Sequence, residues 1–272
     1  MKCIICKSKS EFFLTKNFDK TQYDFLMKDI GIVHYYKCVN CGFTISKTHV
    51  GMDNKKWMTL NSDFHHFIET STASINQPPY IEQAIMLMLL EKEQIINLES
   101  AIDFAGGYGT LSKLLKKYFN LNLAVYDPYV NGPEQIEYVN KEDLIKYNVV
   151  LNSALFEHLF TRDSFDEMNN LVSGNGFMII HTVICENIPQ NENWFYMDPP
   201  VHCAFHTNKS MSILMSQWNY EASIYCPSAK SWILLKKAKS SIEEKIESIN
   251  RELQTEYFIY KKGFVDYWKG FS

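Results

Sequence analysis

A short segment near the middle of the chain, residues 100–115, constrains the fold more than any other part of the sequence. Residues 102–105 predict a short buried strand, Gly106, Gly107 and Gly109 crowd the turn after it, and leucines then recur at helical spacing. Glycine has no Cβ and tolerates positive φ, so the backbone of such a turn can approach a ligand closely. The first N–H groups of the following helix are unpaired and add donors. The segment therefore predicts a strand, a ligand-binding turn and a helix in an α/β fold.

The next predicted strand ends in a carboxylate. Residues 121–126 are mostly apolar, and Asp127 follows them directly. In dinucleotide-binding folds, an acid at this place accepts hydrogen bonds from a ribose diol, so we expect Asp127 to bind a ribose. Pro128 and Tyr129 come next, at the edge of the sheet where such folds bind ligands. Tyr129 has two interpretations: it stacks on an adenine, or it only covers the loop.

The glycine turn resembles the motif of a known cofactor-binding family. After Asp103, small residues stand at every second position, namely Ala105, Gly107 and Gly109. This pattern is similar to the D-x-G-x-G-x-G motif of the class I S-adenosylmethionine-dependent methyltransferases. The resemblance implies that Asp103 helps to hold the methionine end of S-adenosylmethionine, while the backbone from Ala105 through Gly106 to Gly109 passes beside the cofactor. Ala105 departs from the first glycine of the motif, and its methyl group narrows the pocket.

The resemblance extends to the next buried strand, predicted over residues 147–153. Polar Asn152 and Ser153 end the strand, and we expect Asn152 beside the cofactor. Glu157 and His158 follow within a Glu-His-Leu sequence. Many small-molecule methyltransferases of this class carry this triplet after the fourth strand, where it borders both cofactor and acceptor. His158 therefore has two interpretations, a catalytic one and one in which it only holds the loop.

Four of the seven cysteines form two C-x-x-C pairs near the N-terminus, at Cys3, Cys6, Cys38 and Cys41. Two such turns make the tetrahedral sulfur cage that zinc prefers, and four thiolates leave no open position for catalysis. A segment of this size has little core, so a structural zinc ion would supply much of its folding free energy. A redox dithiol is the alternative interpretation.

An irregular segment, residues 186–206, follows the fifth predicted strand. Long loops inside compact domains commonly bind ligands, so we expect this one to form the acceptor wall. Its His202 is the first candidate for a general base, with His158 and then His206 behind it, because a neutral imidazole can accept a proton from a hydroxyl. A purely positioning role for His202 is the alternative. Residues 193–214 contain an aromatic run, then His202, and then Thr207 at the start of the next expected helix. This arrangement resembles methyltransferases that tailor sugars and natural products, and some sugar C-methyltransferases also begin with a zinc module.

These observations predict an α/β fold with a Rossmann-like class I methyltransferase sheet, mostly parallel and closed by an antiparallel hairpin. The expected parts are a zinc ribbon (1–50), a connector or lid (51–77), the Rossmann-like methyltransferase domain (78–238) and a C-terminal amphipathic helix with an aromatic tail (239–272). The helix packs on the domain or forms a homodimer, since its exposed aromatics would otherwise leave an apolar patch.

Three local predictions complete the expected fold. Residues 135–139 predict a third parallel strand, and Ser173–Gly176, with two glycines, predicts a turn before the fifth strand. Residues 240–262 predict one continuous amphipathic helix, because apolar residues recur there at helical spacing.

The amino-acid composition argues against nucleic-acid and membrane partners. The net charge of −4 gives no broad basic face for nucleic acid, and no apolar run is long enough to span a membrane. The first residues are too short and polar for a secretory signal, so we expect a cytoplasmic protein whose cysteines are thiols or metal ligands.

The sequence thus favours methyl transfer from S-adenosylmethionine to a small-molecule acceptor, such as a hydroxyl of a sugar or nucleotide sugar in carbohydrate biosynthesis, with C-methylation as a variant. An rRNA or tRNA methyltransferase with a zinc module is one alternative, because residues 1–50 contain eight lysines against four acidic residues. An N-P-P-Y base-flipping sequence after the fourth strand is absent, which opposes it. A non-catalytic zinc-ribbon binding protein is the other alternative.

Overall fold

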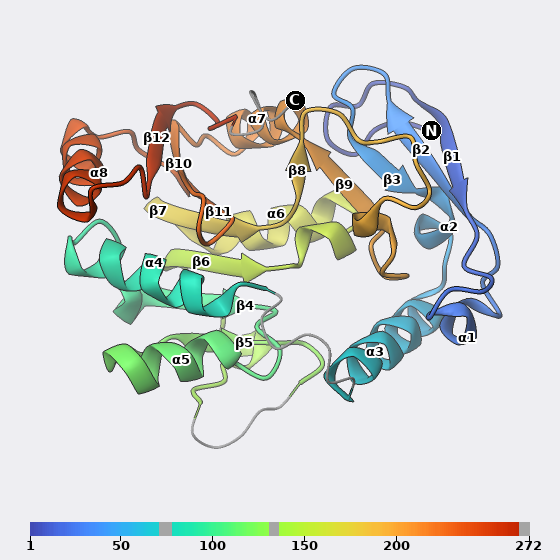
Figure 1. Ribbon diagram of the computed structural model, residues 1–272, viewed down its shortest axis with the longest axis horizontal. Coiled ribbons are helices and arrows are strands. Elements are labelled where there is room, and N and C mark those ends of the chain that lie inside the picture. Colours follow the sequence, from blue (N-terminus) through green and yellow to red (C-terminus); the bar gives the residue numbers. More distant parts are fainter. Residues whose placement is uncertain (71–77, 131–135, 267–272) are drawn as a thin grey trace.

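The computed structural model describes residues 1–70, 78–130 and 136–266, which form two sheets flanked by helices (Figure 1). The larger sheet has seven strands in the order β12-β10-β11-β7-β6-β4-β5. Neighbouring strands β5, β4, β6 and β7 run parallel, whereas β11 is antiparallel to both β7 and β10. These strands are β4 (Ala101–Phe104), β5 (Ala124–Tyr126), β6 (Tyr147–Ser153), β7 (Val172–His181), β10 (Ala222–Cys226), β11 (Ser231–Leu235) and β12 (Ile259–Lys262). The predicted Rossmann-like sheet with a closing antiparallel hairpin is confirmed.

Helices cover both faces of this sheet. One apolar core lies between the sheet and α4 (Tyr80–Lys92), α5 (Thr110–Phe119) and α8 (Ser240–Leu253). A second core, on the other face, includes α6 (Arg162–Leu171) and α7 (Asn208–Gln217). In α5, Leu111 and Leu115 lie one turn apart and are both fully buried, which fits the helical spacing seen in the sequence. The glycine turn before α5 is therefore held between a buried strand and a packed helix.

The second sheet joins three N-terminal strands to two strands from residues 184–207. Its order is β1-β2-β3-β9-β8, and β3 pairs with β9 through Thr44 and Phe205. The strands are β1 (Ser10–Lys16), β2 (Val33–Cys38), β3 (Thr44–Ser46), β8 (Ile184–Cys185) and β9 (Ala204–Thr207). Strands from the cysteine-rich segment therefore continue into the segment that carries His202, on the right of Figure 1. The domain boundary at residue 50 stays a prediction.

Shorter elements complete the fold. Helices α1 (Asp24–Met27), α2 (Lys47–Val50) and α3 (Asn54–Thr70) follow the N-terminal strands. Single 3-10 turns are η1 (Leu98–Ser100), η2 (Lys141–Asp143), η3 (Phe156–His158) and η4 (Phe195–Met197). Within the described ranges, no helix is long and apolar enough to cross a membrane.

The turn predicted at Ser173–Gly176 is wrong, because these residues lie inside β7. The strand shifts register here against β6, and a Cβ on Gly176 would lie only 2.6 Å from the carbonyl oxygen of Asn148. The glycine therefore permits a close approach of two strands, a role that the sequence does not distinguish from a turn.

The C-terminal helix is shorter than predicted. It ends at Leu253 because Gln254 adopts a left-handed conformation with φ of 52°. The side chain of Asn250 then holds both backbone groups of Phe258, and the chain turns back as β12 along β10. Ile242, Ile246 and Ile249 are buried, so the apolar face of α8 packs on the domain.

Two further predictions lie wholly or partly outside the described residues. The expected aromatic tail after Asp266 lies outside them, as does Gln135 at the start of the expected third strand. Of the rest of that strand, Tyr138 forms a single parallel bridge with Val125.

Candidate functional site

The glycine turn has alternating left-handed residues. Ala105, Gly107 and Gly109 have φ of 61°, 55° and 66°. Positive φ favours glycine, so the small residues at these positions follow from the backbone, and Ala105 carries some strain. The turn is anchored to the neighbouring strand, because the Ala105 N–H donates to the Tyr126 carbonyl over 2.7 Å. A Cβ on Gly107 would meet nothing within 4 Å among the described atoms, so this residue borders open space.

Asp127 ties the turn to the loop that follows β5. Its Oδ2 accepts from the Gly107 N–H at 2.9 Å, and its Oδ1 accepts from the N–H groups of Tyr129 and Val130 at 2.8 and 3.0 Å. A carboxylate has about four lone-pair sites and these three contacts use three of them, so Oδ2 can still accept from one ligand hydroxyl. The structure thus brings the two predicted ligand segments together. Pro128 and Tyr129 are both exposed beside them.

Three buried polar atoms next to this turn have no hydrogen-bond partner among the described residues: Asp103 Oδ1, Asn152 Oδ1 and Gln83 Nε2. Asp103 and Asn152 lie at the carboxyl ends of adjacent strands β4 and β6, and Gln83 of α4 accepts from Ser153 Oγ at 2.8 Å. Burial, with a smaller effect of the Asp127 charge, raises the pKa of Asp103 to about 7. Since leaving such groups unpaired costs about 1 to 3 kcal/mol each, the set is suited to a polar ligand. Gln83 was not predicted, although a glutamine on the buried face of a helix is a signal.

A second cluster joins Glu157, His158 and His202, whose donor atoms all lie within 4.8 Å of one another. All three side chains are buried. Glu157 and His158 follow β6 in η3, whereas His202 follows η4, so the structure unites two segments that the sequence keeps apart. Glu157 Oε2 accepts from Thr182 Oγ1 at 2.9 Å. The predicted pair His158 and His202 therefore shares one buried site with a carboxyl group.

Burial sets the charge of this cluster. It raises the pKa of Glu157 to about 7, although hydrogen bonds from Tyr196 and Thr182 partly oppose the rise. It lowers the pKa of His202 to about 4 and that of His158 well below its usual range. Both imidazoles are therefore neutral near pH 7.

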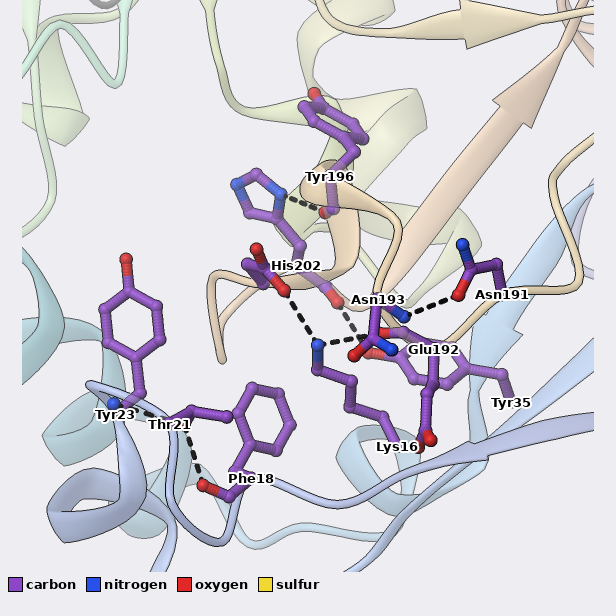
Figure 2. A network of polar contacts seen from close by, with 11 residues as sticks. Lys16, Phe18, Thr21, Tyr23, Tyr35, Asn191, Glu192, Asn193, Tyr196 and His202 are labelled. Carbon is purple, nitrogen blue, oxygen red and sulfur yellow. Dashed lines mark hydrogen bonds and ion pairs between the residues drawn. The ribbon is translucent and has the colours of Figure 1, made fainter.

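Neighbouring groups fix the tautomers of both histidines. His202 Nδ1 lies 2.8 Å from the Tyr196 carbonyl oxygen, which only accepts, so Nδ1 carries the proton (Figure 2). Asn61 donates its Nδ2 to the Trp57 carbonyl, which turns its Oδ1 toward His158 Nδ1 at 3.3 Å. In both rings the Nε2 atom is thus the free acceptor, and it makes no hydrogen bond with any described residue.

Helix α3 connects the two clusters. The ring of His65 stacks on that of His158, with centroids 5.8 Å apart and planes 18° apart. Packing lowers the pKa of His65, and the Asp127 carboxylate offsets part of this shift. His65 therefore contacts the histidine cluster and also interacts electrostatically with Asp127. The predicted connector packs against the site, and its role as a lid stays a prediction.

His206, the third candidate base, does not join the cluster. Its ring is buried against Phe43, Phe156 and Phe165, and burial lowers its pKa to about 3. The structure assigns it to the core between the two sheets.

Strands β1, β2 and β3, which we call the N-terminal sheet, hold the segment that carries His202. Lys16, whose side chain is only 3% exposed, donates to the Glu192 carbonyl at 2.7 Å and pairs with Asp198 at 2.8 Å. Tyr35 of β2 donates its hydroxyl to the backbone carbonyl of His202 at 3.0 Å (Figure 2). The sequence did not indicate these contacts, because each joins residues more than 160 positions apart.

The four predicted cysteine ligands converge. The Sγ atoms of Cys3 and Cys41 lie 3.7 Å apart, and Cys6 Sγ lies 3.4 Å from Cys38 and 3.5 Å from Cys41. A tetrahedral zinc ion with sulfur ligands at about 2.3 Å places its sulfurs about 3.8 Å apart. Backbone N–H groups of Ile5 and Cys41 also point at sulfurs, so the donor set fits a closed metal site.

A scan against protein-family models and a search of curated proteins find no match for this chain. Solved structures that match part of this chain include the plantazolicin methyltransferase BpumL in complex with a pentazolic desmethylPZN analog and SAH, at 10% identity and a TM-score of 0.42, covering 67% of this chain and 94% of that one. An O-methyltransferase family protein from Burkholderia thailandensis has 12% identity, a TM-score of 0.42 and coverages of 71% and 63%. Magnesium protoporphyrin IX methyltransferase from Synechocystis PCC 6803, with bound SAH, has 13% identity, a TM-score of 0.43 and coverages of 69% and 97%. At these values the likenesses assign neither a family nor an activity to the chain.

Proposed function

We propose that this protein transfers a methyl group from S-adenosylmethionine to a small-molecule acceptor. The observation that carries the proposal is the pairing of two groups at one edge of the sheet: a left-handed small-residue turn bound to Asp127, and a buried Glu157–His158–His202 cluster beside it. Ligands of open α/β sheets bind at this edge.

The residues of the turn fit the parts of the cofactor. Asp127 keeps one free lone pair, on Oδ2, for a ribose hydroxyl, and Gly107 leaves open space beside the backbone. The unpaired acceptors of Asp103 and Asn152 suit the ammonium group of the methionine end, and the unpaired donor of Gln83 suits its carboxylate. Tyr129, which is exposed and follows Asp127 by two positions, is the proposed stacking partner of the adenine.

The cofactor, when bound, supplies a methyl group that its sulfonium charge already activates. The work left to the protein is alignment, with the acceptor atom and the methyl carbon held about 3 to 3.5 Å apart. His202 is the candidate base, since its Nδ1–H is held by the Tyr196 carbonyl and its Nε2 is free to accept the acceptor's proton. His158 positions the acceptor beside it.

A sugar or nucleotide-sugar hydroxyl is the acceptor that we propose. A hydroxyl must lose a proton during transfer, and an imidazole that is neutral near pH 7 has a lone pair to take it. Burial makes His202 a weak base in the free protein, because its pKa is lowered to about 4. In the same proposal the four cysteines hold a structural zinc ion, whose role is to fold the N-terminal sheet that anchors the His202 segment.

The alternative of an RNA acceptor is less well supported. It rested on the excess of lysines in residues 1–50, but Lys16 is buried in an ion pair with Asp198, which lies outside that range. One of the surplus positive charges is thus neutralised within the protein, which weakens the case for a basic face.

Titration calorimetry with S-adenosylhomocysteine tests the proposal. We expect binding to one site per chain and a loss of about 1 to 3 kcal/mol in Asp127→Ala, because a ligand hydroxyl loses its acceptor. Asp127→Asn keeps one acceptor oxygen and should lie between wild type and Asp127→Ala. Exposed Asp29 is the matched control, and Asp29→Ala should bind as wild type does. No binding to the wild type, or equal affinity in all variants, would refute the site.

A further inference from the structure

The geometry points to a divalent transition-metal site formed by Glu157, His158 and His202, separate from the cysteine site. Two imidazoles and one carboxylate offer one donor atom each within 4.8 Å of one another. Ligands at about 2.0 to 2.2 Å from a shared ion lie about 3 to 4 Å apart, so small side-chain rotations would close the set. Two histidines with one carboxylate leave open positions on such an ion.

The orientation of the rings supports this inference. A metal-bound imidazole commonly donates its other N–H to a carbonyl or carboxylate oxygen, which fixes the tautomer. Here His202 Nδ1 donates to the Tyr196 carbonyl at 2.8 Å, and His158 Nδ1 faces the Asn61 amide oxygen at 3.3 Å. Both lone pairs are therefore on Nε2, the atom left free to bind an ion.

A neighbouring hydroxyl also fixes the carboxyl group of Glu157. Thr182 donates to Glu157 Oε2 at 2.9 Å and so fixes the carboxylate in its buried place. Glu157 is only 1% exposed, and no lysine or arginine among the described residues pairs with it. A buried carboxylate is costly without a counter-charge, and a divalent cation would provide one.

The ligands differ in chemistry from the cysteine cage. Thiolates favour zinc, whereas imidazole and carboxylate ligands accept several divalent ions. The inference does not depend on the proposed methyl transfer, since it concerns binding alone. With an ion bound, His202 would be a ligand, so its role as a base applies to the metal-free cluster.

Cobalt uptake tests the inference. Protein whose cysteine site is filled with zinc is dialysed against Co²⁺, and both metals are measured per chain. We expect one zinc and one cobalt in the wild type, and one zinc with no cobalt in Glu157→Gln and His202→Asn. His34→Asn, which changes an exposed histidine, should keep both metals.

The Asn61→Ala variant provides a second test that leaves all three ligands in place. Loss of a group that orients a metal-bound histidine typically weakens affinity 10- to 100-fold, so cobalt binding should weaken by about that factor. The zinc content and circular dichroism of each variant show whether it has folded. Failure of the wild type to take up cobalt would overturn the inference. So would full cobalt uptake by folded Glu157→Gln and His202→Asn proteins, because the ion would then lie elsewhere.

Discussion

The two sides of the candidate site are built in different ways. The cofactor side is mainly local: Asp103, Gly107 and Asp127 lie within one strand-turn-helix-strand unit, and the Gly107 N–H bonds directly to Asp127. Gln83 of α4 and Asn152 of β6 are added to it from neighbouring elements. The other side is assembled from distant segments, since His202 is held by Tyr35 of the N-terminal sheet and His158 by Asn61 of α3. The cofactor side should therefore tolerate damage to the N-terminal sheet, whereas the histidine cluster should not.

The largest expected effect follows from loss of the cysteine site. In Cys41→Ser one of four ligands is missing, and structural zinc in small modules is worth about 10 to 16 kcal/mol of binding free energy. We expect the N-terminal sheet to lose order and the His202 segment to lose its hydrogen-exchange protection, while S-adenosylhomocysteine still binds. Hydrogen exchange and calorimetry on the same protein measure both effects.

Cys185→Ser is the control for this experiment, because Cys185 lies outside the cysteine cluster. It should keep zinc and the protection of the His202 segment. If Cys41→Ser loses its zinc but keeps the His202 segment fully protected, the two regions are not coupled as the structure indicates.

The second-largest expected effect is on the turnover rate, with little change in cofactor affinity. His202→Ala should lower turnover about 10²-fold or more, because the transfer loses its base, with cofactor affinity nearly unchanged. Steady-state rates with the true acceptor, together with calorimetry, measure this split, and His34→Ala should behave as wild type. Normal turnover in His202→Ala would remove the histidine from the chemistry.

A third and smaller effect concerns Lys16, which holds the segment that carries His202. Lys16→Met removes the buried ammonium group and leaves the Glu192 carbonyl without its donor, which should lower the free energy of unfolding by about 1 to 3 kcal/mol. Denaturant unfolding measures the change. Lys9→Met breaks an ion pair whose lysine is 74% exposed and should leave the unfolding midpoint unchanged. Equal midpoints for both variants would show that Lys16 does not anchor the loop.

The smallest effect is confined to the cofactor side. Because burial raises the pKa of Asp103 to about 7, the free protein holds this proton at pH 6. An ammonium group bound beside it favours the carboxylate, so cofactor binding should release up to about one proton at pH 6, and affinity should rise from pH 6 to pH 7. Calorimetry in buffers of different ionisation enthalpy counts the protons. The release should vanish in Asp103→Asn, and its persistence there would assign the proton to another group.

The contrast between local and distant contacts also explains which features the sequence could predict. The glycine turn, Asp127 and the cysteine pairs were found because their chemistry requires particular residues at short spacing, and the parallel sheet followed from the strand pattern. Gln83, Asn61 and Lys16 were missed, since each acts on a segment that only the tertiary fold brings near. The error at Gly176 has a similar origin, because a glycine in a turn and a glycine between close strands look alike in sequence.

The central claim is that the glycine turn and the Glu157–His158–His202 cluster are two sides of one methyl-transfer site. A crystal structure of the protein with S-adenosylmethionine tests it most directly. The account predicts the ribose at Asp127, the methionine end at Asp103 and Asn152, and the methyl group facing His202 Nε2 across a gap that one acceptor atom fills. A cofactor bound elsewhere, or a methyl group directed away from the cluster, would contradict it.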